Sequence, residues 1–215
     1  MLKKNLDLYK ERYDTISKNQ LKRINEFISN SKFSNKDLGK FEEKLDYIVN
    51  IPRETIKIIF YIIPEVTPRP RLNFKHGNFY VRNAKTNNDF MKLVIDNEED
   101  FNKYIYRNCE FECRLYFPIP AGMNKVDTLL AEVGAIRPVN NKDWDNLGKT
   151  YSDMIQKWLL LNDSLVVSGT SKKFYSLKPR VEIELEYLTE YDCKFNQKQI
   201  ENTKVYKREF DIDKV

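Results

Sequence analysis

The chain has 215 residues, enough for one domain of ordinary size with an extension or for two small domains. Apolar residues make up 41% and aromatic residues 13% of it, which is enough material for a hydrophobic core, and the formal net charge of +5 leans toward an anionic partner. The sequence has no apolar run of membrane-spanning length, and "MLKKNLDLYK" lacks the apolar segment of a secretory signal. We therefore expect a cytoplasmic protein with no membrane partner.

The cysteines and the histidine favour neither disulfides nor a zinc finger. If the segment around "CEFEC" is a strand, Cys109 and Cys113 share one face about 13 Å apart, too far for a disulfide. His76 is the only histidine and cannot complete a zinc-finger pattern. We expect free thiols in a reducing compartment.

Residues 1–50 are predicted to be helical. Apolar side chains recur every three to four positions between Leu38 and Ile48. Ser34 and Asp37 resemble a capping box, with Asp in place of the usual Glu. This region therefore predicts an N-terminal helical extension.

From Pro52 onward the composition changes to β-branched and aromatic residues. We expect strands at 55–64, 109–120, 165–174 and 181–188, and helices at 87–106 and 146–160. Prolines and Gly77 predict loops and a tight turn in between. Less regular stretches are a loop with a short helix or strand at 121–140, and a loose tail or added edge element at 189–215.

Together these elements predict an α/β (α+β) fold, with a small mixed β-sheet and flanking helices behind the N-terminal helical extension. The predicted division of the chain is 1–51 for the extension, 52–190 for the main domain and 191–215 for a charged C-terminal tail.

Two carboxylates stand one residue apart at the start of the last predicted helix. An N-cap role would account for Asp145 but not for Asp143. Two close carboxylates repel each other, and the candidates that could offset this are Lys142, Lys149 or a divalent cation. Mg²⁺ prefers oxygen ligands, usually one or two carboxylates with water and phosphate oxygens.

A third acidic residue, Asp163, follows the same helix. A helix of 15 residues carries the chain about 22 Å. The sequence therefore does not place Asp163 beside Asp143 and Asp145 within one chain. Completion of the site across a dimer and a shorter helix both stay open.

The stretches "DWDNLGKTYSDMI", "LLLNDSLVVSGTSKKF" and "KPRVEIEL" resemble the RusA-like Holliday-junction resolvases, which are crossover-junction endodeoxyribonucleases common in phages and prophages. The resemblance covers about residues 55–188. The motif residues at matching spacings are Asp143, Asp145, Asn146, Leu147, Lys149 and Asp153. The family's acidic pair before the next strand is Asn162–Asp163 here, so only its second member is acidic.

The resemblance implies an endodeoxyribonuclease that depends on Mg²⁺ or Mn²⁺ and resolves Holliday junctions or other branched DNA in recombination and repair. It further implies metal binding by Asp143, Asp145 and Asp163, with Lys149 beside them as a fourth catalytic residue. A homodimer in a bacterial cell, encoded by a phage or prophage, is also implied.

Basic residues suited to phosphate contacts lie around these motifs. The predicted DNA-binding residues are Arg69, Arg71, Lys75, Lys142, Lys172 and Lys173.

Three alternatives stay open. The first is a nuclease of the same fold that acts on other branched or replication structures. The second is a non-catalytic DNA-binding protein with an acidic helix cap, which the acidic trio disfavours because carboxylates repel phosphate. The third is a helical interaction module formed by residues 1–50.

Overall fold

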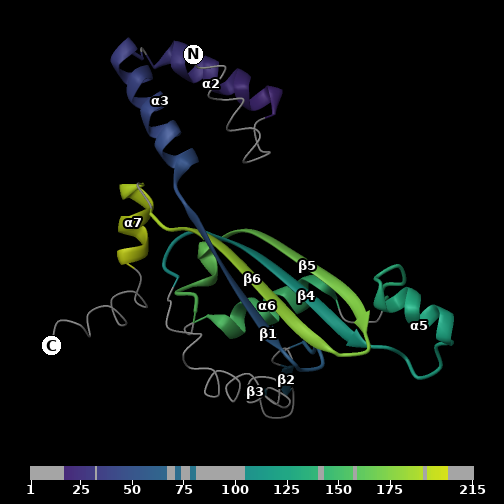
Figure 1. Cartoon of the computed structure of the whole chain (residues 1–215). Coiled ribbons are helices and arrows are strands. Elements are labelled where there is room, and N and C mark those ends of the chain that lie inside the picture. Colours follow the sequence, from purple (N-terminus) through teal and green to yellow (C-terminus); the bar gives the residue numbers. More distant parts are fainter. Residues whose placement is uncertain are drawn as a thin grey trace. The chain divides into compact units, whose positions relative to one another are not determined.

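The structure, a computed structural model, describes residues 17–31, 33–66, 71–73, 78–80, 105–139, 143–156, 159–190 and 193–202 (Figure 1). The helix predicted at 87–106 lies outside these ranges, except for its last two positions. Contacts divide the chain into two compact units, one of residues 1–52 with 189–193 and the other of residues 53–188 with 194–215. Among the helices that the structure describes, none is long and apolar enough to cross a membrane.

The described residues of the first unit include the helices α2 (Lys18–Asn30) and α3 (Asn35–Asn50), so the predicted N-terminal helical part is confirmed. The capping box at the start of α3 is present. The Ser34 hydroxyl accepts a hydrogen bond from the Asp37 amide at 3.2 Å, and the Asp37 carboxylate accepts one from the Ser34 amide at 3.1 Å. These bonds satisfy backbone donors that the first helical turn leaves unpaired.

The second unit is built on a four-stranded mixed sheet, which confirms the predicted fold class. Its strands, in spatial order, are β1 (Arg53–Phe60), β6 (Arg180–Leu188), β4 (Cys109–Pro118) and β5 (Val166–Ser176). Strand β6 runs antiparallel to both of its neighbours, and β4 runs parallel to β5. A parallel pair needs a crossover connection, and α6 lies within it.

Shorter elements complete the second unit. They are the two-stranded sheet of β2 (Arg71–Asn73) and β3 (Asn78–Tyr80), the helices α5 (Lys125–Glu132), α6 (Trp144–Ile155) and α7 (Lys194–Glu201), and the 3₁₀ turn η2 (Asp163–Leu165). The region at 121–140, predicted as a loop with a short helix or strand, therefore contains a helix.

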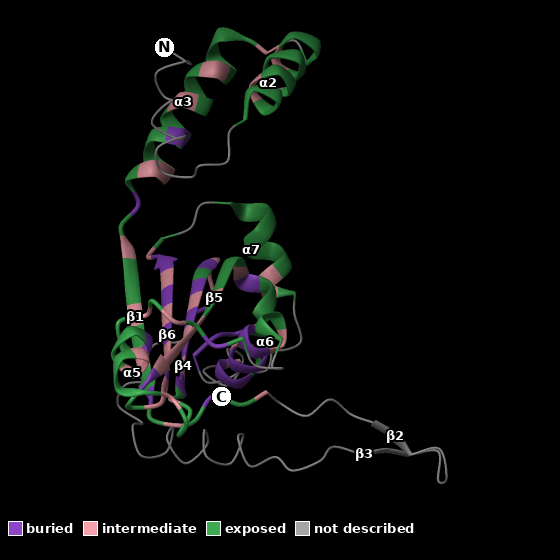
Figure 2. Ribbon diagram, turned by 90° about the vertical axis from the view of Figure 1, so that its right-hand side faces the viewer, coloured by how far each residue is buried: buried purple, intermediate pink, exposed green. Residues whose placement is uncertain are grey.

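One face of the sheet packs against α6 to form the core. Along β6, Val181, Ile183 and Leu185 are buried and alternate with glutamates on the opposite face, as the sequence pattern predicts. Helix α6 buries Leu147 and Tyr151 in the same cluster. Figure 2 shows the buried residues gathered on β4, β6 and the sheet-facing side of α6.

The bounds predicted for the strand at 55–64 were wrong, and the strand is partly exposed. Strand β1 ends at Phe60, and Ile59 is 48% exposed. The reason is that β1 lies at the edge of the sheet and pairs only with β6. Ile59 lies opposite Glu182, so its side chain is on the face turned away from α6. A β-branched run can therefore form a half-exposed edge strand.

Cys109 and Cys113 are buried, free and on the same face of β4, as predicted. Burial raises the pKa of both thiols to about 12. The thiolate is the reactive form of cysteine, so these two side chains are inert core residues.

Candidate functional site

The first of the paired aspartates is the N-cap of α6. Asp143 is exposed, with φ −63° and ψ 134°, and its side chain makes no capping hydrogen bond to the helix backbone. Its Oδ2 instead accepts a hydrogen bond from the Asn146 side chain at 3.1 Å. The expectation that Asp145 is the N-cap was wrong, because the helix begins at Trp144, two residues earlier than predicted. Asp143 therefore occupies a capping position without using its carboxylate as a cap.

Asp145, Lys149 and Asp153 form one exposed line along α6. They are spaced four residues apart, which places them on neighbouring turns of the same face. Asp145 makes no hydrogen bond or ion pair with any residue that the structure describes, and Lys149 acts electrostatically on Asp153 instead. The four-residue spacing in the sequence already allowed Lys149 to pair with Asp145 or with Asp153, and in the structure Lys149 acts on Asp153.

Asp163 lies at the other end of α6. The helix has 12 residues, so its ends are about 18 Å apart. Asp163 is exposed and begins η2, immediately before β5, and its negative charge acts on Asp153 near the C-terminal end of the helix. Asp143 and Asp145 are at the N-terminal end. Among the described residues, the predicted trio does not come together as a group that could hold a metal ion.

Both charged neighbours of Asp153, Lys149 and Asp163, affect the pKa of its carboxyl group. Burial raises the pKa of its carboxyl above the ordinary value of 3.8, Lys149 lowers it, and Asp163 raises it, with a net upward shift. We expect Asp163→Asn to lower the pKa of Asp153 and Lys149→Gln to raise it, as measured by NMR titration of the carboxyl carbon. If the pKa of Asp153 is the same in Asp163→Asn as in the wild-type chain, the two carboxylates are not neighbours.

The same shift predicts a pH dependence of stability. Because the folded-state pKa of Asp153 lies above the unfolded one, its contribution to stability is full at low pH and is lost as the pH rises through the folded value. Asp153→Asn should therefore stabilise the protein at pH 7, and the gain should vanish below pH 3.8. Urea unfolding at several pH values measures this difference.

The donor chemistry fits a divalent cation only in part. Two exposed carboxylates at a helix start match the one or two that Mg²⁺ usually takes from a protein. Across the residues that the structure describes, however, no three acidic, histidine or cysteine side chains come close enough to hold a metal ion. Asp143 and Asp145 alone are thus the cation-binding candidates within one chain, and Asp163 is not brought to them.

A close approach between α6 and β5 fixes the helix on the sheet. A Cβ atom placed on Gly148 would lie 2.1 Å from Ser171 Oγ and 3.4 Å from Ser171 Cβ. Gly148 therefore has a packing role that outweighs its low helix propensity. The contact lies one turn after Asp145, so it ties the start of the helix to the sheet.

Gly148→Ala is expected to destabilise the fold by about 1–3 kcal/mol, because the added methyl group collides with Ser171. A second change, Ser171→Ala, should restore most of that loss by removing the colliding oxygen. The matched control is Gly39→Ala in α3, where an added Cβ would meet nothing within 4 Å. It should stabilise that helix by about 1 kcal/mol. Urea unfolding followed by circular dichroism measures all three variants.

The predicted DNA-binding residues are only partly described. Arg69, Lys75 and Lys142 lie outside the described residues, and Arg71 is in β2 with its side chain undescribed. Lys172 and Lys173 are on β5, and their phosphate contacts stay a prediction.

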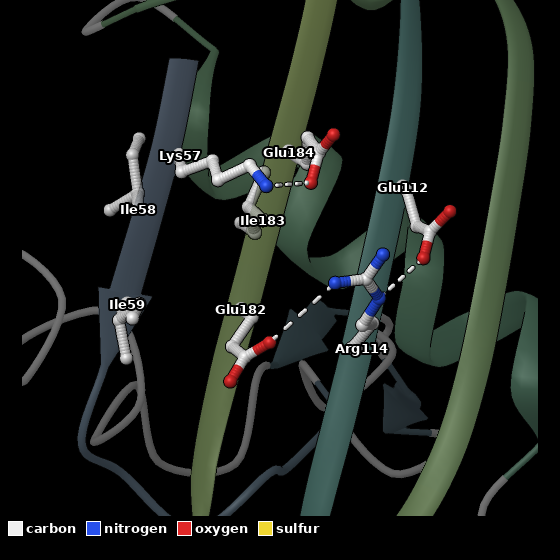
Figure 3. A pocket seen from close by; sticks show the side chains of 8 residues that line it. All are labelled: Lys57, Ile58, Ile59, Glu112, Arg114, Glu182, Ile183 and Glu184. Atoms are coloured by element: carbon white, nitrogen blue, oxygen red, sulfur yellow. Dashed lines mark hydrogen bonds and ion pairs between the residues drawn. The ribbon is translucent and has the colours of Figure 1, made fainter. Parts of the chain in front are cut away.

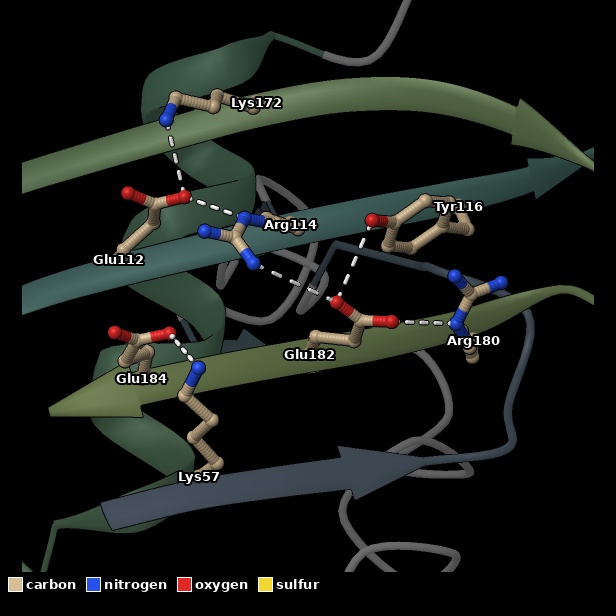
Figure 4. A network of polar contacts seen from close by, with 8 residues as sticks. All are labelled: Lys57, Glu112, Arg114, Tyr116, Lys172, Arg180, Glu182 and Glu184. Carbon is tan, nitrogen blue, oxygen red and sulfur yellow. Dashed lines mark hydrogen bonds and ion pairs between the residues drawn. The ribbon is translucent and has the colours of Figure 1, made fainter. Parts of the chain in front are cut away.

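Lys172 belongs to the sheet face turned away from α6. Its Nζ lies 3.0 Å from Glu112 Oε1, and Glu112 also accepts from Arg114 (Figure 4). Burial opposes its ionisation, but these two bonds hold the pKa of Glu112 below its usual range. The charge of Lys172 is thus already balanced within the sheet.

This outer face is a network of ion pairs around a hollow of about 120 Å³ (Figure 3). Glu182 bridges Arg114 and Arg180, and Lys57 pairs with Glu184 at 3.0 Å. The acidic members of the face are Glu110, Glu112, Glu182, Glu184 and Glu186. Each of these carboxylates forms an ion pair with a basic side chain, so these basic side chains are already engaged and less available to a DNA backbone.

Comparison with known proteins adds a family and one relative. A family model described as "Endodeoxyribonuclease RusA" matches residues 62–186, which is more than half of the chain and includes all of α6 and η2. A curated protein of Bacillus subtilis (strain 168), described as "Uncharacterized protein YqaN", is 28% identical over 134 residues. That similarity covers 60% of this chain and 94% of the relative.

Proposed function

Because the chain belongs to the RusA endodeoxyribonuclease family, we propose that it is a divalent-metal-dependent endonuclease that cleaves Holliday junctions or other branched DNA. The observation that carries this proposal is the pair of exposed carboxylates, Asp143 and Asp145, at the start of α6, neither of which caps the helix backbone. We place the activity in DNA recombination and repair in the cytoplasm of a bacterial cell, and a similar protein from Bacillus subtilis supports the bacterial setting alone.

Hydrolysis of a phosphodiester needs an activated water, an anchored phosphate and a neutralised leaving oxygen. A bound Mg²⁺ or Mn²⁺ supplies all three. Asp143 and Asp145 would hold it, and the Asn146 side chain orients Asp143 by the hydrogen bond at 3.1 Å. Lys149, one turn along the same face, would stabilise negative charge that develops on the phosphate.

Asp163 enters this proposal through a second copy of the chain. It does not form a metal-binding group of three with the aspartate pair within the described part of one chain, so we assign it to the site of a homodimer in which each subunit completes the other's acidic set. A four-way junction has two-fold symmetry, and a dimer with the same symmetry would place two matched cuts.

The basic residues would hold the DNA backbone rather than read its sequence. Arg69, Arg71, Lys75 and Lys142 all lie in the family-matched span. Lys173 has its Cα opposite Leu115, on the face of the sheet that packs against α6, so it is better placed for this role than Lys172.

The direct test compares cleavage of a four-way junction and of a linear duplex of the same sequence, with Mg²⁺, with Mn²⁺ and with a chelator. Cleavage of the junction alone, only with a divalent ion, supports the proposal. Equal cleavage of the duplex would remove the junction preference and leave a less selective nuclease. Junction binding without cleavage under every ion would favour a non-catalytic DNA-binding protein.

A further inference from the structure

Arg137 fastens the segment that leads into Asp143 to the edge of the sheet. Its guanidinium carbon lies 3.7 Å from the centre of the Phe174 ring. Its Nε donates to the Gly134 carbonyl at 2.9 Å, and its Nη1 donates to the Lys173 carbonyl at 2.9 Å. The side chain is therefore held by its flat face and by two of its donors, although it is exposed to solvent.

The local sequence explains this arrangement. Helix α5 ends at Glu132, and two residues later Gly134 has a φ of 80°, which suits glycine; a Cβ there would lie 3.6 Å from the Phe174 ring. Strand β5 is an edge strand of the sheet as far as the structure describes it, and the Lys173 carbonyl accepts from Arg137 there. Arg137 fits there because a guanidinium stacks on a ring and donates from its rim at the same time.

The Phe174 ring that Arg137 covers is itself packed against a second aromatic ring. Phe174 stacks on Tyr116 with 5.0 Å between ring centres, and Arg180 covers the other side of Tyr116 at 3.7 Å. Figure 4 shows Arg180 beside Tyr116 on the outer face of the sheet. The four side chains thus form a row that runs from the loop after α5 across the three neighbouring strands β5, β4 and β6, which gives Arg137 a rigid support.

The aspartate pair lies between two attachments to β5. Earlier in the sequence, Arg137 contacts residues 173–174 by a hydrogen bond and a cation–π interaction. Later in the sequence, Gly148 packs closely against Ser171. The two attachments use opposite faces of β5, because Phe174 shares its face with Tyr116, while Ser171 faces the helix. Residues on both sides of the aspartate pair in the sequence, Arg137 and Gly148, therefore contact the same strand, β5.

We propose that Arg137 is a positioning residue, which sets the place of Asp143 and Asp145 by anchoring the preceding chain to Phe174 and Lys173. The proposal rests on the function proposed for that aspartate pair. By charge alone, an exposed arginine six residues before Asp143 would be assigned to phosphate binding. The two roles predict different results, because positioning needs the Phe174 ring and phosphate binding needs only the charge.

The experiment compares Arg137→Gln and Phe174→Leu with the wild-type chain, and uses Phe174→Tyr as the conservative variant. Both disruptive variants should lower the rate of junction cleavage at saturating DNA by on the order of 10- to 100-fold, since small misplacements of reacting groups cost this much. The salt dependence of junction binding should not change, because no phosphate contact is lost. Phe174→Tyr keeps the ring and should retain the wild-type rate.

Hydrogen exchange supplies a readout that does not depend on cleavage. Amides of residues 143–148 should exchange on the order of tenfold faster in Arg137→Gln and in Phe174→Leu, while those of β6 stay unchanged. The control Lys178→Gln removes a cation–π contact with Tyr61, 4.1 Å from Lys178 Nζ, and should leave residues 143–148 unchanged.

Three outcomes would overturn the assignment. The first is unchanged hydrogen exchange at residues 143–148 in both disruptive variants. The second is a weaker salt dependence of junction binding in Arg137→Gln together with normal cleavage in Phe174→Leu. The third is an equal loss of cleavage rate in Phe174→Tyr and Phe174→Leu. If the wild-type chain cuts no branched DNA, the proposed function fails, and the exchange measurement still decides whether Arg137 positions the segment.

Discussion

Asp145→Asn should lower junction cleavage by on the order of 10²–10³-fold, the size of effect seen when one group that stabilises the transition state is removed. Asparagine has nearly the same shape but lacks the negative charge that holds a cation. Asp145 is exposed and makes no bond with the described residues, so its replacement leaves packing intact. Cleavage rates on a four-way junction, together with thermal unfolding, measure the two effects separately.

Asp127→Asn is the matched control for this variant. Asp127 also lies in the first turn of an exposed helix, α5, and therefore makes the same kind of favourable interaction with a helix N-terminus. It should lose a few tenths of a kcal/mol of stability and no activity. If Asp145→Asn cleaves as fast as Asp127→Asn, the aspartate pair is only a charged helix start, and the catalytic assignment is wrong.

The features of the fold that could be predicted from sequence are those set by local pattern. Strand β6 alternates strictly between apolar residues and glutamate, so its core face follows from the pleat. The N-terminal helix α3 begins at Ser34 because a capping box is a short-range signal. In both cases the information lies within a few residues.

The end of α6 could not be predicted in the same way. The chain leaves the helix at Gln156, with φ −61° and ψ 137°, although no Gly or Pro marks a stop. The following leucines favour helix by propensity, but Leu159 and Leu161 form backbone hydrogen bonds with Ile105 instead. A partner about fifty residues away in sequence therefore decides this boundary.

The sequence identified which residues belong to the candidate site, but it did not predict how they are arranged in space. The spacing of Asp143, Asp145 and Lys149 identified one end of α6, while the position of Asp163 beyond the other end depends on where the helix stops. Arg137 left no signal in the sequence, because its role depends on Phe174, which only the parallel pairing of β4 and β5 brings beside it.

An equal mixture of Asp145→Asn and Asp163→Asn chains should regain junction cleavage that neither variant shows alone. In the proposed dimer, each site joins Asp145 of one subunit with Asp163 of the partner subunit. A mixed dimer then has one site with both substitutions and one site with neither. Half of the dimers in a random mixture are mixed, so about one quarter of the wild-type number of sites should return. Co-refolding the two variants and measuring the nicking of junctions tests this.

The opposite result is equally informative. If all three aspartates of a site came from one chain, every site in a mixed dimer would carry one substitution, and mixing would restore nothing. The matched control mixes Asp145→Asn with Asp143→Asn, which alter the same end of α6. Both proposed arrangements place these two residues in one subunit, so that mixture should stay inactive. Recovery with Asp163→Asn and none with Asp143→Asn would therefore locate Asp163 in the partner's site, whereas recovery in neither mixture would require α6 and η2 to rearrange within one chain.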